Sequence, residues 1–180
     1  MAGGAGRAAA FIHADILIAD ENLRLRPEER ADEQFLLHLF KTTRAEQFAQ
    51  AALPTPMIDT LLEQQFRLQV KGYSAQFPDA TSLLIERMGE PVGRLLLQCS
   101  ARDWRIIDIA LLPSRRGHGI GTSVIAAIAA AARRQQAQSL RLAVLVTNDA
   151  ARRLYHRLGF VETDIGAGAA HIRMLKNLAD

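Results

Sequence analysis

The sequence predicts an α/β fold of the mixed-sheet (α+β) kind, with helices on both faces of one sheet. Helical and strand-like hydrophobic patterns follow one another along the chain in the order β-αα-β-β-β-α-β-α-β-β. Leu140 to Val146 is a near-continuous apolar run, which is typical of a strand buried on both faces. A glycine-rich loop at residues 116–121 joins a predicted strand to a predicted helix.

The first expected elements are a strand and a pair of helices. Asn22 to Arg26 alternates polar and apolar residues, which indicates a short strand that ends at Pro27. Glu28 to Gln50 has the spacing of an amphipathic helix, and its first two residues are acidic, as suits a first turn. The prolines within residues 53–56 break this helix, and a second helix is expected from Met57 to Ser74. Its apolar side comprises Ile58, Leu61, Leu62, Phe66 and Val70.

Three strands joined by tight turns are expected next. Gly89-Glu90 and Arg102-Asp103 mark the two turns between them. Pro113 closes the third strand, because proline cannot donate a hydrogen bond to a neighbouring strand. The expected strands are Thr81 to Arg87, Pro91 to Cys99 and Trp104 to Leu112.

The C-terminal part is expected to alternate helices and strands around the apolar run at residues 140–146. A helix is predicted from about Gly119 to Gln136, and a short helix from Asp149 to Leu158. Gly159 follows the short helix at the position of a C-cap glycine. Phe160 to Asp164 and Ala170 to Leu175 are expected to pair as a closing hairpin.

Length and composition bound the class of protein. The 180 residues correspond to one ordinary domain, which we expect at residues 22–177, after a flexible N-terminal tail at residues 1–21. The hydrophobic content of 49% and the charged content of 23% are typical of a soluble globular protein. No apolar run approaches the roughly 18 residues that cross a bilayer, so no membrane segment is expected. The single cysteine, Cys99, excludes an intramolecular disulfide and favours a cytoplasmic location.

The charge pattern argues against two other classes of protein. A formal net charge of +3 is mild for 180 residues, and the paired arginines are scattered, so nucleic-acid binding is not expected. The five histidines and one cysteine show no metal-ligand spacing, so no metal site is expected either.

The loop before the helix at residue 119 has the composition of a phosphate-binding site. Gly117, Gly119 and Gly121 let the backbone turn and lie close to a ligand. Successive N–H groups at a helix N-terminus then face an anion, and two arginines just before the loop add positive charge. A dinucleotide fingerprint would need glycine where Thr122 stands, and a P-loop would need Gly-Lys-Ser/Thr, which is absent.

Two motifs in this region resemble those of the GNAT family of N-acetyltransferases. Arg116-x-x-Gly119-x-Gly121 follows a strand at residues 109–113 and resembles motif A, which cradles the pyrophosphate of coenzyme A. A second motif resembles motif B and reads Asn148-x-x-Ala151-x-x-x-Tyr155-x-x-x-Gly159-Phe160. The resemblance covers residues 23–176 and is specific within residues 107–160. It implies a GNAT-type acyl-CoA N-acyltransferase fold.

The resemblance also implies acetyl-CoA as the co-substrate. Its pantetheine arm would lie in a gap between the strand that ends at Leu112 and the strand at residues 140–146. Main-chain groups would hold the arm, and one of their N–H groups could polarise the thioester. The residues expected at the cofactor are Ala110, Leu111, Leu112, Arg116, Gly117, His118, Gly119, Ile120, Gly121, Thr122, Asn148, Ala151 and Tyr155.

Tyr155 and Asp108 are the candidate catalytic residues. The resemblance places Tyr155 near the sulfur, where it would protonate the departing thiolate; the alternative is a tyrosine that only packs. Many GNAT enzymes carry a glutamate in the strand before motif A, and here Asp108 is the only carboxylate well inside that strand. Asp108 is interpreted as a base acting through water or as an anchor for the amine. A structural salt bridge to an arginine is the alternative.

The function implied is direct transfer of an acetyl group from acetyl-CoA to an amine of a small molecule, peptide or protein. A non-catalytic module of the same fold that binds acyl-CoA is the alternative. Gln65, Gln69 and Tyr73 form a polar stripe that could contact the acceptor, and the loop at residues 166–169 could shape its site. A homodimer is common among such folds, and the sequence leaves the oligomeric state open.

Overall fold

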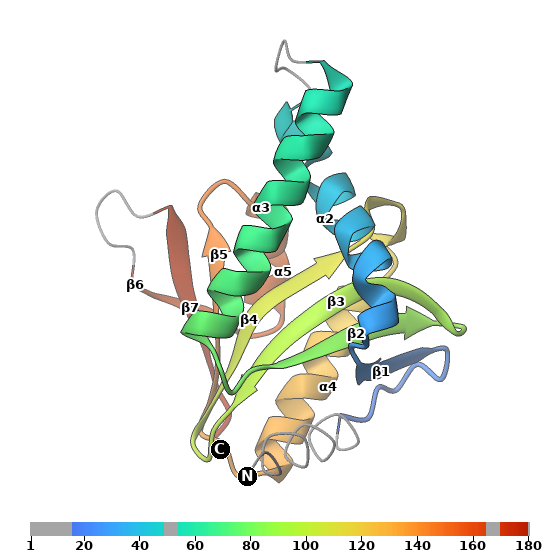
Figure 1. Cartoon of the computed structure of the whole chain (residues 1–180). Coiled ribbons are helices and arrows are strands. Elements are labelled where there is room, and N and C mark those ends of the chain that lie inside the picture. The colour runs from blue at the N-terminus through green and yellow to red at the C-terminus, as the bar shows by residue number, and fades with distance from the viewer. Residues whose placement is uncertain (1–15, 49–53, 165–169, 180) are drawn as a thin grey trace, which may run out of the picture.

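Seven strands form one mixed sheet (Figure 1). They are β1 (Leu23–Pro27), β2 (Thr81–Arg87), β3 (Glu90–Cys99), β4 (Asp103–Leu111), β5 (Ser139–Leu145), β6 (Val161–Asp164) and β7 (His171–Asn177). The computed structural model of the chain describes residues 16–48, 54–164 and 170–179. The strand order is β1-β2-β3-β4-β5-β7-β6, and only β4 and β5 run parallel.

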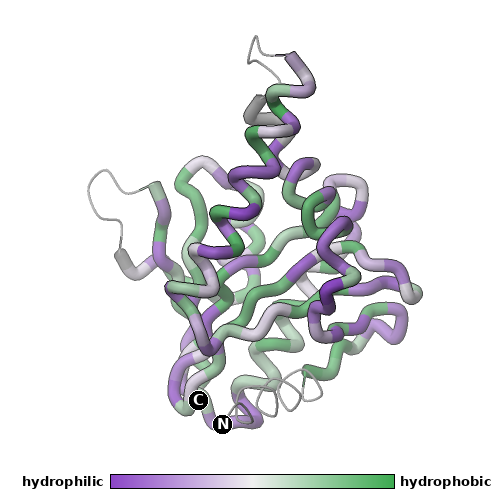
Figure 2. Tube along the Cα trace, in the orientation of Figure 1, coloured by the Kyte–Doolittle hydropathy of each residue, from purple (hydrophilic) through white to green (hydrophobic). Residues whose placement is uncertain are grey.

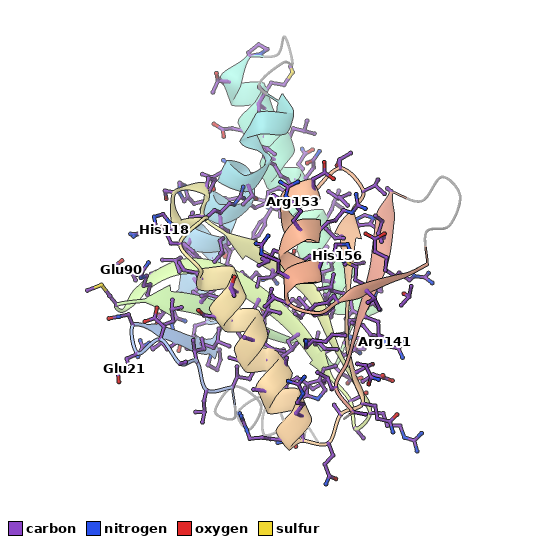
Figure 3. The ribbon with its side chains drawn as sticks, turned by 180° about the vertical axis from the view of Figure 1, so that it is seen from behind. Glu21, Glu90, His118, Arg141, Arg153 and His156 are labelled. Atoms are coloured by element: carbon purple, nitrogen blue, oxygen red, sulfur yellow. The ribbon has the colours of Figure 1, made fainter. Side chains whose placement is uncertain are left out.

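Two helices cover each face of this sheet (Figures 1 and 3). Helices α2 (Glu33–Phe48) and α3 (Thr55–Gln76) lie on one face, and α4 (Ile120–Arg134) and α5 (Asp149–Arg157) lie on the other. Two 3-10 turns, η1 (Arg30–Asp32) and η2 (Pro113–Arg115), precede α2 and α4. The expected class and order of elements are therefore confirmed. Of the flexible tail expected at residues 1–21, residues 1–15 lie outside the described residues, as does the loop at residues 166–169. The described remainder does not fit a flexible tail, because Ile16 is buried in the hydrophobic core.

The expected start of the first helix is wrong by several residues. Glu28 and Glu29 precede the helix instead of forming its first turn. Asp32 closes a capping box, because its carboxylate accepts a hydrogen bond of 2.8 Å from the Glu29 N–H. The chain can therefore begin its helical turn only after Glu29, and α2 itself starts at Glu33.

The sheet separates two apolar cores. The larger core lies against α4 and α5 and includes Trp104 and Ile106, and the smaller one packs α2 and α3 onto β2. Figure 2 shows mainly hydrophobic residues along the central strands and α4, with longer hydrophilic stretches on α3. Val70 was expected to face inward but is 36% exposed, because the inward face of α3 continues from Phe66 to Gln69 instead.

A bulge in β4 reverses the direction of the side chains that follow it. Ile106 pairs with Leu97, but Asp108 pairs with Leu96, so Ile107 is an extra residue in the ladder. Residues two apart in a regular strand share a face. The bulge instead leaves Ile106 in the larger core and turns Asp108 to the face covered by α2 and α3.

Candidate active site

The parallel pair β4–β5 separates along its length, as the resemblance to the GNAT family implied. The two strands pair only between residues 103–106 of β4 and residues 139–142 of β5. Beyond this point β5 continues to pair with β7 as far as Leu145. Residues 107–111 of β4 therefore present a strand edge towards β5 that has no strand partner, in a part of the chain that is fully described. Such an edge can hydrogen-bond an extended ligand as a strand would.

At the open edge of β4, only every second residue directs its backbone N–H and C=O groups into the gap. The N–H of Leu112 donates to the Val92 carbonyl at 3.0 Å and is therefore directed towards β3. Alternate residues of a strand direct their N–H and C=O groups to opposite neighbours, so the backbone groups of Leu111 point into the gap. Arg116 Nε already donates to the Leu111 carbonyl at 3.2 Å. Of Ala110, Leu111 and Leu112, only Leu111 thus offers an N–H to the gap, and Leu112 lies one residue beyond the strand.

The glycine-rich loop continues from the end of β4 into α4. Gly117 and Gly119 have φ angles of 77° and 78°, a left-handed conformation that side chains other than glycine rarely adopt. Figure 3 shows His118 on this loop, at the N-terminal end of α4. Among the described residues, no group accepts a hydrogen bond from the N–H groups of residues 117–122. These free donors lie at the positive end of a helix dipole, which is the chemistry that a pyrophosphate requires.

The side chains of this loop contribute positive charge at its exposed surface. Arg115, Arg116 and His118 are all exposed to solvent. Gly121 lies inside the first turn of α4, where a β-carbon would be 3.7 Å from Leu154 and 3.9 Å from Leu111. The loop and the open edge of β4 are continuous through Leu111, so a ligand with a pyrophosphate and an extended arm fits both.

Helix α5 brings Asn148 and Tyr155 to the same side of the sheet. Asn148 is the N-cap of α5, because its Oδ1 accepts a hydrogen bond of 3.1 Å from the Ala151 N–H. The neighbouring Asp149 pairs with Arg152 at 3.3 Å. Arg153 and His156 lie on the outer side of this helix (Figure 3). His156 is about half exposed and contacts Glu162 at 3.1 Å.

Tyr155 is buried against Phe160, with 5.8 Å between the ring centroids. Burial raises the pKa of the Tyr155 phenol to about 12, and the nearby charge of Asp108 adds to the shift. The phenol therefore keeps its proton throughout the neutral range. Cys99 behaves similarly, since burial raises the pKa of its thiol to about 12, which does not favour a nucleophile.

Asp108 is a partly buried carboxyl group without an ion-pair partner among the described residues. Burial raises its pKa, and the charges of Arg94 and Arg44 offset only part of that increase. The structural salt bridge that was the alternative interpretation is thus not formed. A carboxyl group with a raised pKa whose charge acts on the Tyr155 phenol is a candidate proton acceptor.

A cavity of about 80 Å³ opens beside Asp108, between α2, α3 and the sheet. Its lining combines apolar side chains with two arginines and one carboxyl group. It is formed by Leu36, Leu39, Phe40, Thr43, Arg44, Phe66, Gln69, Arg94, Asp108 and Ala110. The polar stripe of α3 therefore reaches the cavity through Gln69, whose amide lies 3.5 Å from the Tyr73 hydroxyl, while Gln65 does not line it.

The sequence analysis missed the two arginines of this cavity. Arg94 stands between Gly93 and an apolar run in β3, and a charge in such a run is a signal of the same kind as Asp108. No comparable sequence signal marks Arg44, because the predicted helix around it contains several other charged residues and one more does not stand out. Its role appears only when Phe40, one turn earlier, is seen beneath the guanidinium at 4.5 Å.

No helix within residues 16–48, 54–164 and 170–179 is long and apolar enough to cross a membrane. Within the same ranges, no group of three or more His, Cys, Asp or Glu side chains could hold a metal ion.

Solved structures with the same fold are numerous. The PaiA N-acetyltransferase of Thermoplasma acidophilum, solved with coenzyme A, has a TM-score of 0.64 at 16% identity, covering 86% of this chain and 98% of the other. An acetyltransferase of Thermus thermophilus has a TM-score of 0.63 at 21% identity, covering 87% and 97%. The ribosomal-protein-S18-alanine N-acetyltransferase of Escherichia coli has a TM-score of 0.60 at 18% identity, covering 88% and 95%. Identities this low show a shared fold.

The sequence itself matches the profile of the Acetyltransferase (GNAT) family over residues 38–160. This match spans more than half of the chain and includes the open edge of β4, the glycine-rich loop and α5. The chain therefore belongs to the GNAT acetyltransferase family. Membership makes it an acetyltransferase with acetyl-CoA as the co-substrate. No curated protein matches the chain in sequence.

Proposed function

We propose that this protein moves an acetyl group from acetyl-CoA directly to an amine of a small molecule, peptide or protein. The observation that carries the proposal is the continuous surface of unpaired backbone donors from the Leu111 edge to the first turn of α4. Asp108 and Tyr155 adjoin this surface, and the charge of Asp108 influences the phenol. An N-acetyltransferase activity, and hence an amine acceptor, is also what the names of two structural neighbours describe.

Main-chain groups would hold most of the donor. The N–H groups of residues 117–122 would bind the pyrophosphate, with Arg116 beside them. The backbone of Leu111 would pair with the pantetheine arm, and its N–H would polarise the thioester carbonyl. Asn148 caps α5 and would thereby fix Ala151 and Tyr155 along the arm.

Asp108 and Tyr155 would handle the protons. Asp108, directly or through water, would accept a proton from the acceptor ammonium, so that the neutral nitrogen can form a bond to the acetyl carbon. The carbon–sulfur bond then breaks and its electrons remain on sulfur. Tyr155 would donate its phenolic proton to that thiolate, and the proton lost when the amide forms restores the phenol through water. Asp108 then releases to solvent the proton that it took from the ammonium, so the reaction yields the amide, the free thiol and one proton.

We further propose that the enzyme acts in the cytoplasm. The single cysteine, Cys99, is compatible with a reducing compartment. We also propose one catalytic domain at residues 22–177, because strands from both ends of this range join the same sheet.

Calorimetric titration of acetyl-CoA into the purified protein tests this proposal. We expect micromolar binding in the wild type and its loss in Gly121→Glu, since the new carboxylate would stand among the phosphate-binding groups. Gly72→Glu is the matched control, because Gly72 is also a helix residue and has no atoms within 4 Å of an added β-carbon. A folded wild type that does not bind acetyl-CoA would refute the proposal.

Turnover is measured next as release of free thiol with a panel of amines. Loss of turnover in Asp108→Asn and Tyr155→Phe, with binding retained, would support the enzymatic role. Binding without turnover of any amine would instead favour a module that only senses acyl-CoA.

A further inference from the structure

The cavity beside Asp108 holds two opposite charges that do not pair with each other. Among the described residues, Asp108 has no cation within 4.0 Å, and Arg44 has no carboxylate partner. The Arg44 guanidinium stacks on Phe40 at 4.5 Å, which orients it without neutralising it. Both side chains line the same cavity.

The second arginine of the cavity is already occupied. Arg94 lies 3.4 Å from the Glu28 carboxylate and donates to Ser82 Oγ at 3.1 Å. Arg94 therefore contributes structure and a background positive potential. Arg44 is the guanidinium that remains available for an anionic group of a ligand.

The size and the remaining lining of the cavity limit what it can bind. Its volume of about 80 Å³ holds roughly six water-sized groups. Its uncharged walls include the apolar side chains of Leu36, Leu39 and Phe66 and the polar side chains of Thr43 and Gln69. A small molecule fits, or one residue of a larger one, with an apolar portion between two charged ends.

We propose that the acceptor is a small zwitterionic amine of the amino-acid type, whose ammonium group faces Asp108 and whose carboxylate pairs with Arg44. This inference rests on the proposed function, since the amine that Asp108 deprotonates is the one that receives the acetyl group. Each end of such a molecule meets the charge that the protein leaves unpaired. A simple alkylamine would leave Arg44 without a partner, and a protein N-terminus would bring a neutral amide to it.

Kinetics with matched acceptors test this assignment. Each of the twenty common amino acids is compared with its carboxamide and, where it exists, the decarboxylated amine, using thiol release at saturating acetyl-CoA. The variants are Arg44→Gln, Arg44→Lys and, as the control, Arg67→Gln, which changes an exposed arginine of α3. Calorimetry with acetyl-CoA is run on every variant.

The expected result is a kcat/KM that is about 10- to 100-fold higher for at least one amino acid than for its uncharged analogues. Arg44→Gln should remove this preference by lowering kcat/KM for the amino acid alone. Arg44→Lys should restore part of it, and Arg67→Gln should match the wild type. Acetyl-CoA affinity should stay constant throughout.

Two results would overturn the inference while the proposed function stands. One is equal or better turnover of amines without a carboxylate, including peptide amides. The other is binding of acetyl-CoA without acetylation of any amino acid. Failure of the folded wild type to bind acetyl-CoA would instead refute the proposed function, and the inference with it.

Discussion

The carbonyl oxygen of Ala110 lies where a β-carbon on Gly93 would have to stand, at a separation of 2.4 Å. Leu111 Cδ2 would be 2.6 Å from the same β-carbon, so both neighbours exclude a side chain. Only glycine lets β3 approach β4 this closely at the point where β4 ends. Because Leu111 also carries the open edge, the position of the donor site depends on this contact.

Gly93→Ala is expected to destabilise the fold and displace the end of β4. Because the clash involves a backbone oxygen, a side-chain rotation cannot relieve it, and the free energy of unfolding should fall by about 1–3 kcal/mol. Acetyl-CoA should also bind more weakly. Gly72→Ala is the control and should stabilise α3 by up to about 1 kcal/mol. Urea unfolding of both variants measures the effects, and a Gly93→Ala protein of wild-type stability would contradict the contact.

Asp108→Asn should abolish most of the activity while leaving acetyl-CoA binding intact. Loss of a general base typically costs about 10²- to 10⁴-fold in rate. In the wild type, activity should fall as the pH decreases through a pKa that lies above the ordinary aspartate value, because only the ionised group accepts a proton. The pH profile of kcat/KM checks this, and an acid limb that persists in Asp108→Asn would assign the base elsewhere.

The same variant should be more stable than the wild type near neutral pH. Burial raises the folded-state pKa of Asp108, so the folded protein binds this proton more tightly than the unfolded chain does. The free energy of unfolding therefore decreases as the pH rises from the unfolded pKa of Asp108 to its higher folded pKa, and asparagine avoids this loss. Thermal unfolding of both proteins at acidic and slightly alkaline pH measures the difference, which should grow with pH. If Asp108→Asn were less stable than the wild type at alkaline pH, the ionised Asp108 carboxylate would instead be making contacts that stabilise the fold.

Tyr155→Phe separates proton donation from packing. Phenylalanine keeps the ring contact with Phe160, so the free energy of unfolding and the affinity for acetyl-CoA should change little. The value of kcat should fall by about 10²-fold if the phenol protonates the thiolate. Because the pKa is raised to about 12, the wild type should show no alkaline limb from Tyr155 below pH about 10. Wild-type turnover in Tyr155→Phe would leave the residue only its packing role.

A second set of charges should govern stability in acid. Arg26 donates to Asp32 through both terminal nitrogens at 2.7 Å and to Glu86 at 2.6 Å, and Arg24 also bonds Glu86. Although burial opposes the change, bonds from these arginines hold the pKa of Glu86 below its usual range, and the bond from Arg26 lowers the pKa of Asp32. These groups stabilise the fold above the unfolded values near pH about 4, and that contribution is lost as the pH falls through the lower folded values.

Glu86→Gln should therefore be less stable at neutral pH, by about 1–3 kcal/mol, and less sensitive to acid than the wild type. Denaturant unfolding between pH 7 and pH 3 measures both effects. Curves that remain parallel throughout would show that Glu86 contributes nothing to acid sensitivity. Glu90→Gln, at the exposed start of β3, is the matched control.

The order of the elements could be predicted because each carries a local signal. The apolar run at residues 140–146 and the glycine-rich loop at 117–121 both lie where expected. The expectation that this strand is buried on both faces is wrong, because Arg141, Ala143 and Leu145 are exposed on one face of β5. The direction of Asp108 could not be predicted in this way. Regular alternation puts Asp108 on the same face as Ile106, and only the register against β3 reveals the extra residue.

The cavity beside Asp108 could not be predicted from the sequence, for a related reason. Its walls come from α2, α3, β3 and β4, which are brought together only by the tertiary fold. Gln69 could be singled out because it recurs at helical spacing, whereas Arg44 becomes informative only once Phe40 and Asp108 are seen near it. Local patterns therefore predicted the glycine-rich loop better than they predicted the cavity beside Asp108.

The open edge of β4 also affects how this protein can diverge. The groups of this edge belong to the peptide backbone, so a change of side chain within residues 107–111 leaves them in place unless it introduces proline. The cavity on the opposite face is lined mainly by side chains, so a substitution at one of these positions changes its lining directly. Under the proposed function, mutational drift can therefore change which amine is recognised while the backbone groups that face acetyl-CoA are kept, so the scaffold is suited to engineering by exchange of α2 and α3.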